Sequence, residues 1–415
     1  MRKFFYVFIF LFFVNLTNTS FKQDKRLSLV GVSIPGPQDF EYDSSVQNVK
    51  IFAQKDCVQE ISKFRKQYET GEAASIREIV WAPSGDALVV QSPRGTRIWD
   101  PNDITGRRCS LAAFNRGAFS PVWSKSSREL ATISGGRHVN LWRSDSGSCV
   151  KEICVQSGKV NCVAISPCER FIASGSENGS VRICDKDSGR MLFDLTGYQY
   201  AIKKILWSPC GGYLLSEDIK KKVIVWELNE RKQIHGFGGQ GNSFEDATWS
   251  FDGKYLAFIH NLKGISVFSL ELNRVICEFD FKGRQVSVLS WSAQENSLII
   301  GMVCGQIVRL DVVVKRYIPF ENSHSAPVKR AIWSPCGRFI LSVSSEILLE
   351  QGFNAMIILW DAKTGKSLWF KKCRMEMENI AWRPKEGICE FAYGNDKGWI
   401  RICKVDTSVL EQSHT

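Results

Sequence analysis

The sequence contains little of the side-chain chemistry on which enzymes depend. Only five histidines occur in 415 residues, and none lies in a nucleophile or metal-binding motif. Despite 14 cysteines there is no Cys-x-x-Cys pair, and both the Gly-x-Ser-x-Gly turn and the Walker phosphate-binding loop are missing. The glycine-rich stretch 236–241 precedes no predicted helix, so it reads as a turn. The sequence predicts a protein that is not an enzyme and needs no cofactor, metal ion or small-molecule substrate.

Long apolar runs and helical periodicity are also scarce. After Val14 no stretch is long enough to cross a bilayer, and none has a sustained helical period. The start differs, because two basic residues precede the apolar run 4–14 and the polar stretch 15–20. This pattern is typical of a secretory signal peptide, so residues 1–20 are interpreted as a signal peptide or a disordered leader. Residues 21–44 are expected to be irregular, and no transmembrane span is predicted.

The sequence does contain a repeat with a period of 42 residues. Each copy places one apolar anchor at the end of an alternating run, directly before a turn rich in Pro, Gly or Ser. The anchors are Trp81, Trp123, Ile165, Trp207, Trp249, Trp291 and Trp333, and Trp382 follows after 49 residues. A repeat of this period predicts stacked copies of one supersecondary unit. The anchors should therefore pack in the core between sheets.

Each copy has the pattern of four short strands. In one copy these are Ile202–Trp207, Tyr213–Ser216, Val223–Trp226 and a stretch near Lys232–Phe237. The seven extra residues of the 49-residue interval fall near 346–353 and predict a longer connection between the second and third strands. That connection is either a binding loop or a tolerated surface insertion.

The two ends of the chain are expected to complete one sheet. Val49–Phe52 and Val58–Phe64 read as strands before the first full copy, whereas the last copy ends near Lys404 without a clear fourth strand. N-terminal residues could therefore fill the gap and close a ring, which removes exposed sheet edges. Residues 405–415 are expected to form a disordered tail.

The cysteines favour an intracellular location. Cys168, Cys210 and Cys336 occupy equivalent Ser-Pro-Cys turns, while Cys109 and Cys277 fall on predicted outer strands. Equivalent positions in separate copies are too far apart to form a disulfide framework unless the copies are neighbours. The cytoplasm or nucleus is therefore favoured, and the secretory pathway stays open because of residues 1–20.

Several phrases resemble the WD-repeat β-propeller family. They are Arg97–Asp100, Ser176–Ile183, Trp333–Gly337 and Ile358–Asp361. The resemblance implies an all-β fold, with a single propeller of seven or eight four-stranded blades over residues 45–404 and eight blades favoured. The C-terminal third, in Trp333–Gly337, Ala381–Pro384 and Ala392–Gly398, is also faintly similar to the propellers of chromatin-bound replisome adaptors.

The family's Gly-His step survives here only as Ser323-His324. The resemblance implies that His324 pairs with Ser342 or Ser344 and with Trp360. Most copies lack this histidine, so their stability is expected to depend on packing instead.

Basic residues recur at equivalent positions of the repeat, and the net charge is +11. One set lies three or four residues before an anchor and comprises Arg77, Lys203, Lys204, Lys329 and Arg330. The other set lies between second and third strands and comprises Arg94, Arg137, Lys220, Lys221, Lys222, Lys263 and Lys397. Acidic residues on the same connections are Glu177, Glu217, Asp218 and Asp396. In a propeller both basic sets open on one face, which predicts a cationic docking surface or, alternatively, ordinary solvated loops.

These observations predict a non-catalytic protein-interaction scaffold or adaptor subunit that docks acidic peptides or domains on its basic face. One alternative is a propeller associated with nucleic acid or chromatin, although no aromatic residues for base stacking alternate with the basic ones. Another alternative is a secreted or lumenal propeller.

Overall fold

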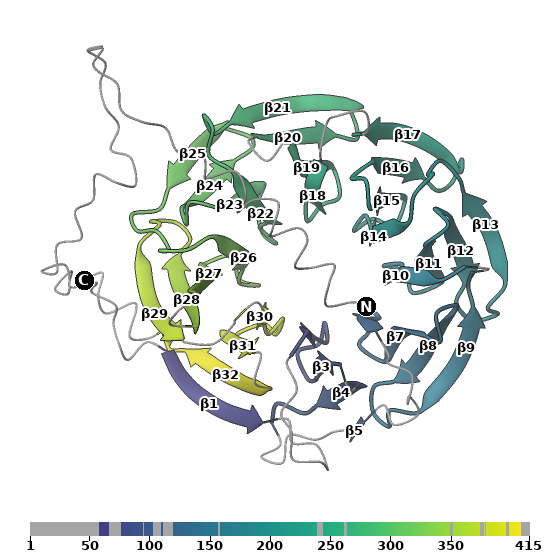
Figure 1. Cartoon of the computed structure of the whole chain (residues 1–415), viewed down its shortest axis with the longest axis horizontal. Coiled ribbons are helices and arrows are strands. Elements are labelled where there is room, and N and C mark those ends of the chain that lie inside the picture. The colour runs from purple at the N-terminus through teal and green to yellow at the C-terminus, as the bar shows by residue number, and fades with distance from the viewer. Residues whose placement is uncertain are drawn as a thin grey trace, which may run out of the picture. The chain divides into compact units, whose positions relative to one another are not determined.

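The computed structural model describes residues 58–65, 76–93, 95–102, 109–110, 119–156, 158–238, 244–260, 264–348, 352–373, 377, 379–395 and 398–407. The predicted signal peptide, the irregular segment 21–44 and the predicted strand Val49–Phe52 lie outside these residues. Within them, the regular elements are strands, and they form eight four-stranded sheets arranged around a common centre (Figure 1). The fold is thus an all-β propeller of eight blades, as predicted.

Seven blades each consist of four consecutive strands, paired in chain order from the centre outward. From blade 1 to blade 7 they are β2 (Glu78–Trp81), β3 (Leu88–Ser92), β4 (Gly95–Trp99) and β5 (Cys109–Ser110); β6 (Phe119–Trp123), β7 (Glu129–Ser134), β8 (His138–Arg143) and β9 (Cys149–Cys154); β10 (Val160–Ile165), β11 (Phe171–Ser176), β12 (Val181–Asp185) and β13 (Met191–Leu195); β14 (Ile202–Trp207), β15 (Tyr213–Asp218), β16 (Val223–Glu227) and β17 (Lys232–Phe237); β18 (Phe244–Trp249), β19 (Tyr255–His260), β20 (Gly264–Ser269) and β21 (Arg274–Asp280); β22 (Val286–Trp291), β23 (Ser297–Met302), β24 (Ile307–Asp311) and β25 (Arg316–Pro319); β26 (Val328–Trp333), β27 (Phe339–Leu348), β28 (Gly352–Asp361) and β29 (Ser367–Cys373).

Blade 8 closes the ring with both ends of the propeller. Its inner strands are β30 (Asn379–Trp382), β31 (Glu390–Gly394) and β32 (Trp399–Val405), and its outer strand is β1 (Val58–Arg65). β1 runs antiparallel to β32, with Val58 opposite Val405 and Arg65 opposite Trp399 (Figure 1). The predicted closure by N-terminal residues is confirmed. Because Val405 is part of β32, the predicted tail begins one residue too early.

The turn between the first two strands shows how local sequence sets the blade. In blade 4 the amide of Gly211 donates to the carbonyl oxygen of Ser208 over 2.9 Å, and the Ser208 hydroxyl accepts from the amide of Tyr213 over 3.0 Å. Gly211 has a φ of +76°, which a residue with a β-carbon adopts only at a cost. The same Ser-Pro-Cys-Gly turn recurs in blade 7, where Gly337 has a φ of +70°.

The anchor tryptophans join each blade to the one before it. Seven are mostly buried between sheets, with Trp207 the most exposed of them. Each indole N–H also donates to the main-chain carbonyl just before the preceding blade's anchor, at distances of 3.0–3.4 Å. The predicted core role is confirmed, and the hydrogen bond explains why this position prefers tryptophan to other apolar residues.

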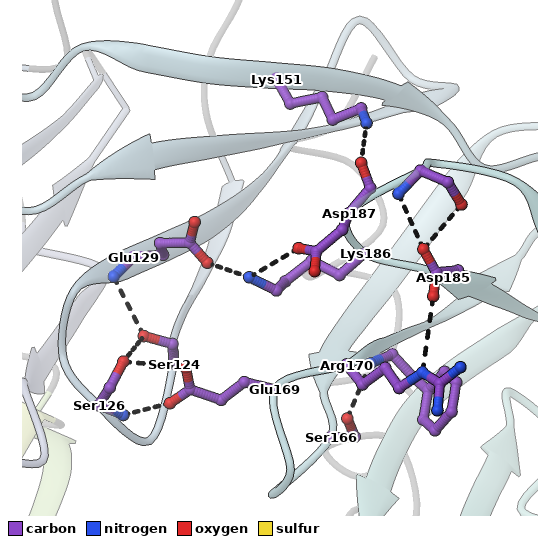
Figure 2. Close-up of polar contacts among 12 residues, drawn as sticks. Ser124, Ser126, Glu129, Lys151, Ser166, Glu169, Arg170, Asp185, Lys186 and Asp187 are labelled. Atoms are coloured by element: carbon purple, nitrogen blue, oxygen red, sulfur yellow. Dashed lines mark hydrogen bonds and ion pairs between the residues drawn. The ribbon is translucent and has the colours of Figure 1, made fainter.

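Ile165 is the exception, because its side chain has no N–H group that could donate to the main chain of blade 2. Polar side chains bridge that seam instead (Figure 2). The Lys186 side chain of blade 3 is only 10% exposed, and its ammonium group donates to the Glu129 carboxylate of blade 2. The Ser126 hydroxyl donates to Glu169 over 2.9 Å, and the Lys151 ammonium reaches the carbonyl oxygen of Asp187. Charge-assisted hydrogen bonds therefore stand where the indole bond is missing.

The seven extra residues of blade 7 lengthen a hairpin. β27 and β28 continue side by side through Glu346–Asn354 and Leu348–Gly352 pairs, so most of the expected loop at 346–353 is strand. The interpretation as a long loop is wrong, because the antiparallel pairing continues from Ser345 opposite Ala355 to Leu348 opposite Gly352.

The histidine network of blade 7 forms as the resemblance implied. Nε2 of His324 lies 2.7 Å from the Ser342 hydroxyl, which also accepts from the Trp360 indole over 2.7 Å. The expectation that other blades depend on packing alone is wrong for blade 4. There, the Tyr198 hydroxyl lies 2.8 Å from that of Ser216, and the Trp226 indole donates to Ser216 over 2.7 Å.

Candidate partner-binding face

One end of blade 4 collects more of the predicted basic residues than any other blade in the described part of the chain. Ile202, the first residue of β14, pairs with Asp218, the last residue of β15, and the amide of Ile219 donates to the carbonyl oxygen of Ala201 over 2.9 Å. Lys203 on β14 therefore lies beside the β15–β16 turn, which carries Lys220. The antiparallel register is what brings the two predicted basic sets together here.

The turn is held rigid by a buried carboxylate. Asp218 accepts from the amides of Lys220 and Lys222 over 2.8 and 2.9 Å. Lys221 between them has a φ of +64°, a conformation that non-glycine residues adopt rarely. The Asp218 carboxylate therefore fixes the backbone of residues 220–222, so the three lysine side chains extend from a turn of defined conformation.

Two tyrosines accompany these lysines. The Lys220 ammonium lies 5.6 Å from the centre of the Tyr200 ring, and the Lys222 ammonium lies 5.5 Å from the centre of the Tyr198 ring. Lys222 also donates to the carbonyl oxygen of Gly197 over 2.7 Å. Lys220, by contrast, is exposed next to Tyr200 and Ile219, which are 45% and 55% exposed. Lys220 is therefore the better placed of the two to meet a partner.

The inner-strand lysines of blade 4 already face acids. Lys204 donates to Asp246 over 2.6 Å and to the carbonyl oxygen of Ala247 over 2.9 Å, which links blades 4 and 5. Lys203 lies 3.3 Å from Glu217, whose side chain is 2% exposed. Burial raises the pKa of Glu217, and Lys203 opposes that shift. The charge of Lys204 therefore serves the fold, while the half-exposed Lys203 remains accessible.

Blades 7 and 1 contribute further cations near the centre. Lys329 and Arg330 on β26 are exposed, and so is Arg77 just before β2. Burial raises the pKa of Glu78, and the positive charge of Arg330 opposes that shift. In blade 2, Arg137 is exposed in the β7–β8 turn, and its carbonyl oxygen accepts from the amide of Val155 over 3.2 Å.

Three predicted positions, Arg94, Lys263 and Lys397, lie outside the described residues. Sequence reasoning missed the tyrosines at 198 and 200, as well as Lys282 and Arg284 before β22. The signal for Tyr198 was its place just before an inner strand, where the family carries histidine. The signal for Lys282 and Arg284 was their position between blades, which the search by anchor spacing did not sample.

The described part of the chain shows no metal centre or membrane helix. No group of three or more His, Cys, Asp or Glu side chains in it is arranged to hold a metal ion. Among the same residues, no helix is both long and apolar enough to cross a bilayer.

Comparisons with known proteins agree with the geometry. Residues 147–185 match the family described as WD domain, G-beta repeat. Among curated proteins no match is found. Among solved structures, the chain is similar to the crystal structure of the computationally designed Ika8 protein, with a TM-score of 0.68 and 15% identity over 84% of this chain and 100% of that one. At this identity the likeness concerns the fold alone.

Proposed function

Because the chain belongs to the WD-repeat β-propeller family, we propose that it is an interaction scaffold or adaptor subunit that docks acidic segments of partner proteins on its basic face. WD-repeat propellers are generally non-catalytic and typically bind other proteins. For this chain we propose in addition that partners bind on the basic face, that the segments they present are acidic, and that the chain acts as a subunit of a complex.

The observation that carries the proposal is the corner of blade 4. Lys220 is exposed there on a turn fixed by Asp218, and Lys203 on the neighbouring β14 is exposed as well, close to Tyr200 and Ile219. Such a corner combines charge for steering with apolar surface for contact, which is the composition of protein-binding surfaces. An acidic peptide with one aromatic or aliphatic side chain fits this chemistry.

Further cations extend the surface toward the centre of the ring. Arg77, Arg137, Lys329 and Arg330 are all exposed. Their separation over several blades favours a partner that crosses the face in extended form. A rigid ring that holds loops in fixed positions limits the ordering cost of such binding.

The test is charge reversal at residues that the fold does not use. K220E/K329E should weaken the retention of partners in quantitative pull-downs at least tenfold, without a change in circular dichroism. K254E/K363E is the matched control, because Lys254 and Lys363 are exposed on turns at the other ends of the strands. Equal retention by both double variants and the wild type would refute the proposal.

A nucleic acid remains a second candidate ligand, favoured by the net charge of +11. Binding to duplex DNA should then weaken steeply as salt increases, in proportion to the phosphates contacted. Proteins that contact several phosphates typically lose about 10³-fold in affinity for DNA between 50 and 200 mM salt. If the affinity of this protein for DNA hardly changes over that interval, nucleic acid is excluded as its ligand.

A further inference from the structure

One turn of blade 6 exposes two large apolar side chains. Val313 and Val314, between β24 and β25, are 70% and 68% exposed, more than any other large hydrophobic side chain in the described part of the chain. Their amides donate to the Asp311 carboxylate over 3.0 and 2.9 Å, Val312 is buried, and Lys315 has a φ of +57°. The turn therefore uses the main chain of the valine pair and leaves both side chains in solvent.

The same turn in other blades shows that its conformation does not require valine. In blades 2 to 7 its fifth residue has a positive φ, so the third and fourth residues can be compared position by position. Both are polar in four of these blades, one is polar in blade 5, and neither is polar in blade 6; the other pairs are Asp145–Ser146, Asp187–Ser188, Asn229–Glu230, Glu271–Leu272 and Lys363–Thr364. Turns favour Gly, Asn, Asp and Ser, and adjacent exposed apolar residues are typical of contact surfaces. Contact with another surface therefore explains the valine pair better than turn formation does.

Further apolar side chains lie at the same end of the neighbouring blade. Leu272 of blade 5, the equivalent of Val314, is 54% exposed, and Phe251 in the turn between β18 and β19 is 43% exposed. The amide of Leu270 donates to the carbonyl oxygen of Lys254 over 3.0 Å, which joins the two turns of blade 5. Because consecutive strands are antiparallel, these turns and that of the valine pair open at the end of the ring opposite the basic face. Blades 5 and 6 are neighbours (Figure 1), so this end carries several apolar tips together.

Positive charge surrounds the valine pair. Four exposed cations lie on its turn and on the equivalent turn of blade 7, namely Lys315, Arg316, Lys363 and Lys366. The aspartates of these turns, Asp311 and Asp361, are half-buried and accept main-chain amides. In the turns of blades 6 and 7 at this end, all of them described, the one exposed acid is Glu295, and Arg309 donates to it over 2.8 Å. The same turns of blade 5 carry equal numbers of acidic and basic residues, so cations prevail from blade 6 to blade 7.

This combination fits the surface of an anionic bilayer better than a protein partner. A protein interface has a continuous apolar centre with a polar rim, whereas these apolar side chains stand on separate turns with cations at their bases. A bilayer accepts apolar tips at any spacing and presents phosphates over its whole surface. Tyr317, 57% exposed on β25 directly after Arg316, belongs to a residue type that is typical of the boundary between headgroups and acyl chains.

We propose that the valine pair inserts into the surface of a bilayer rich in anionic phospholipids, with Lys315 and Arg316 at the level of the phosphates and the blade 7 lysines beside them. Two valines and a few cations give weak, reversible binding, because stable anchoring needs several signals together. Loss of either the apolar or the charged part therefore releases the chain from the bilayer. The basic face at the opposite end of the ring remains accessible, so this inference does not depend on the proposed function.

The experiment measures the sedimentation of the whole chain with lipid vesicles. Phosphatidylcholine vesicles that contain phosphatidylserine should bind it at least about tenfold more tightly than vesicles of phosphatidylcholine alone, and added salt should weaken the binding. V313S/V314S keeps the charge and should weaken the binding about tenfold. I219S removes an apolar side chain that is 55% exposed at the opposite end, and it should bind like the wild type. Equal binding by V313S/V314S and the wild type, or no preference for phosphatidylserine, would overturn the proposal.

Charge reversal identifies the end of the ring that meets the bilayer. K315E/K363E and K220E/K329E change the net charge equally, at opposite ends. Only K315E/K363E should release the vesicles, and only K220E/K329E should lose the partner proteins of the proposed function, so the two proposals fail separately. Release by K220E/K329E to the same extent contradicts insertion of the valine pair. So does a dimer in sedimentation equilibrium that V313S/V314S abolishes, because a second copy of the chain would then cover the tips. Circular dichroism verifies that each variant is folded.

Discussion

The indole nitrogen of Trp333 donates a hydrogen bond to the carbonyl oxygen of Ser290 over 3.1 Å, from blade 7 to blade 6. The bond lies at the seam between the two blades, where Trp333 is only 7% exposed. Six other anchors make the same bond to their preceding blade. The indoles thus combine apolar packing with a directional link, and together they set the angle at which neighbouring blades meet.

Replacing Trp333 by Phe keeps an aromatic ring but removes the donor, so the Ser290 carbonyl loses its partner. We expect a loss of about 2 kcal/mol in the free energy of unfolding, from the unsatisfied carbonyl and the smaller ring together. Urea denaturation followed by circular dichroism measures it. The control is Ile165→Val, at the anchor without a polar link, which should cost about 1 kcal/mol for one methylene. A W333F midpoint equal to that of the wild type would contradict the role of the bond.

The repeat made the fold predictable, but not every contact. The anchor spacing and the family resemblance predicted seven or eight four-stranded sheets, with eight favoured. The strands Ile202–Trp207 and Lys232–Phe237 match their predicted bounds. The prediction that the ring closes came from counting the expected strands at the two ends of the repeat region. These features depend on the local residue pattern and on the need to bury sheet edges, and both can be recognised from the order of residues in the sequence.

Side-chain pairing between blades was not predictable in the same way. Nothing in the spacing indicates that Lys204 reaches Asp246, because such a pair depends on the twist between neighbouring sheets. The hairpin at 346–353 was misjudged since extra residues can lengthen either a loop or a ladder.

The seam at Ile165 should depend on the Lys186–Glu129 pair. Lys186→Met leaves the Glu129 carboxylate, 23% exposed, without its ammonium partner. We expect K186M to cost about 2 kcal/mol, less than a fully buried pair because water still reaches the acid. K186M/E129Q should be less destabilised than the sum of its single variants. Strict additivity in this double-mutant cycle, measured by urea denaturation, is the result that rules out coupling across the seam.

Tyr198 replaces the family histidine in blade 4, and its hydroxyl should matter more than its ring. It donates to the carbonyl oxygen of Ser216 over 2.6 Å and accepts from the amide of Ile224 over 3.1 Å. Tyr198→Phe should therefore cost about 1–3 kcal/mol, because the buried groups that it serves lose their partner. Tyr200→Phe, which alters an exposed ring two residues away, should change stability by less than about 0.5 kcal/mol. Comparable losses in both variants would speak against a blade-4 network.

His324 should make the stability of the propeller sensitive to acid. Burial lowers the pKa of His324 to about 3, whereas the unfolded chain has the ordinary value of 6.5. Between these values the unfolded state binds a proton that the folded state does not. The stabilisation is therefore complete above pH 6.5 and decreases as the pH falls toward 3, by about 1.4 kcal/mol per pH unit.

The histidine's contribution is separated from that of the carboxylates by comparison with His324→Gln, which keeps a polar group near Ser342 but does not titrate. Urea midpoints measured from pH 7 to pH 4 should decline more steeply for the wild type than for H324Q. H324Q should be the less stable protein at pH 7, because the amide fits the site between Ser342 and Trp360 less well than imidazole. Below pH 5 the difference in stability between the wild type and H324Q should narrow, because only the wild type loses stability by keeping a buried imidazole unprotonated. Parallel curves over the whole range would mean that His324 is not the titrating group.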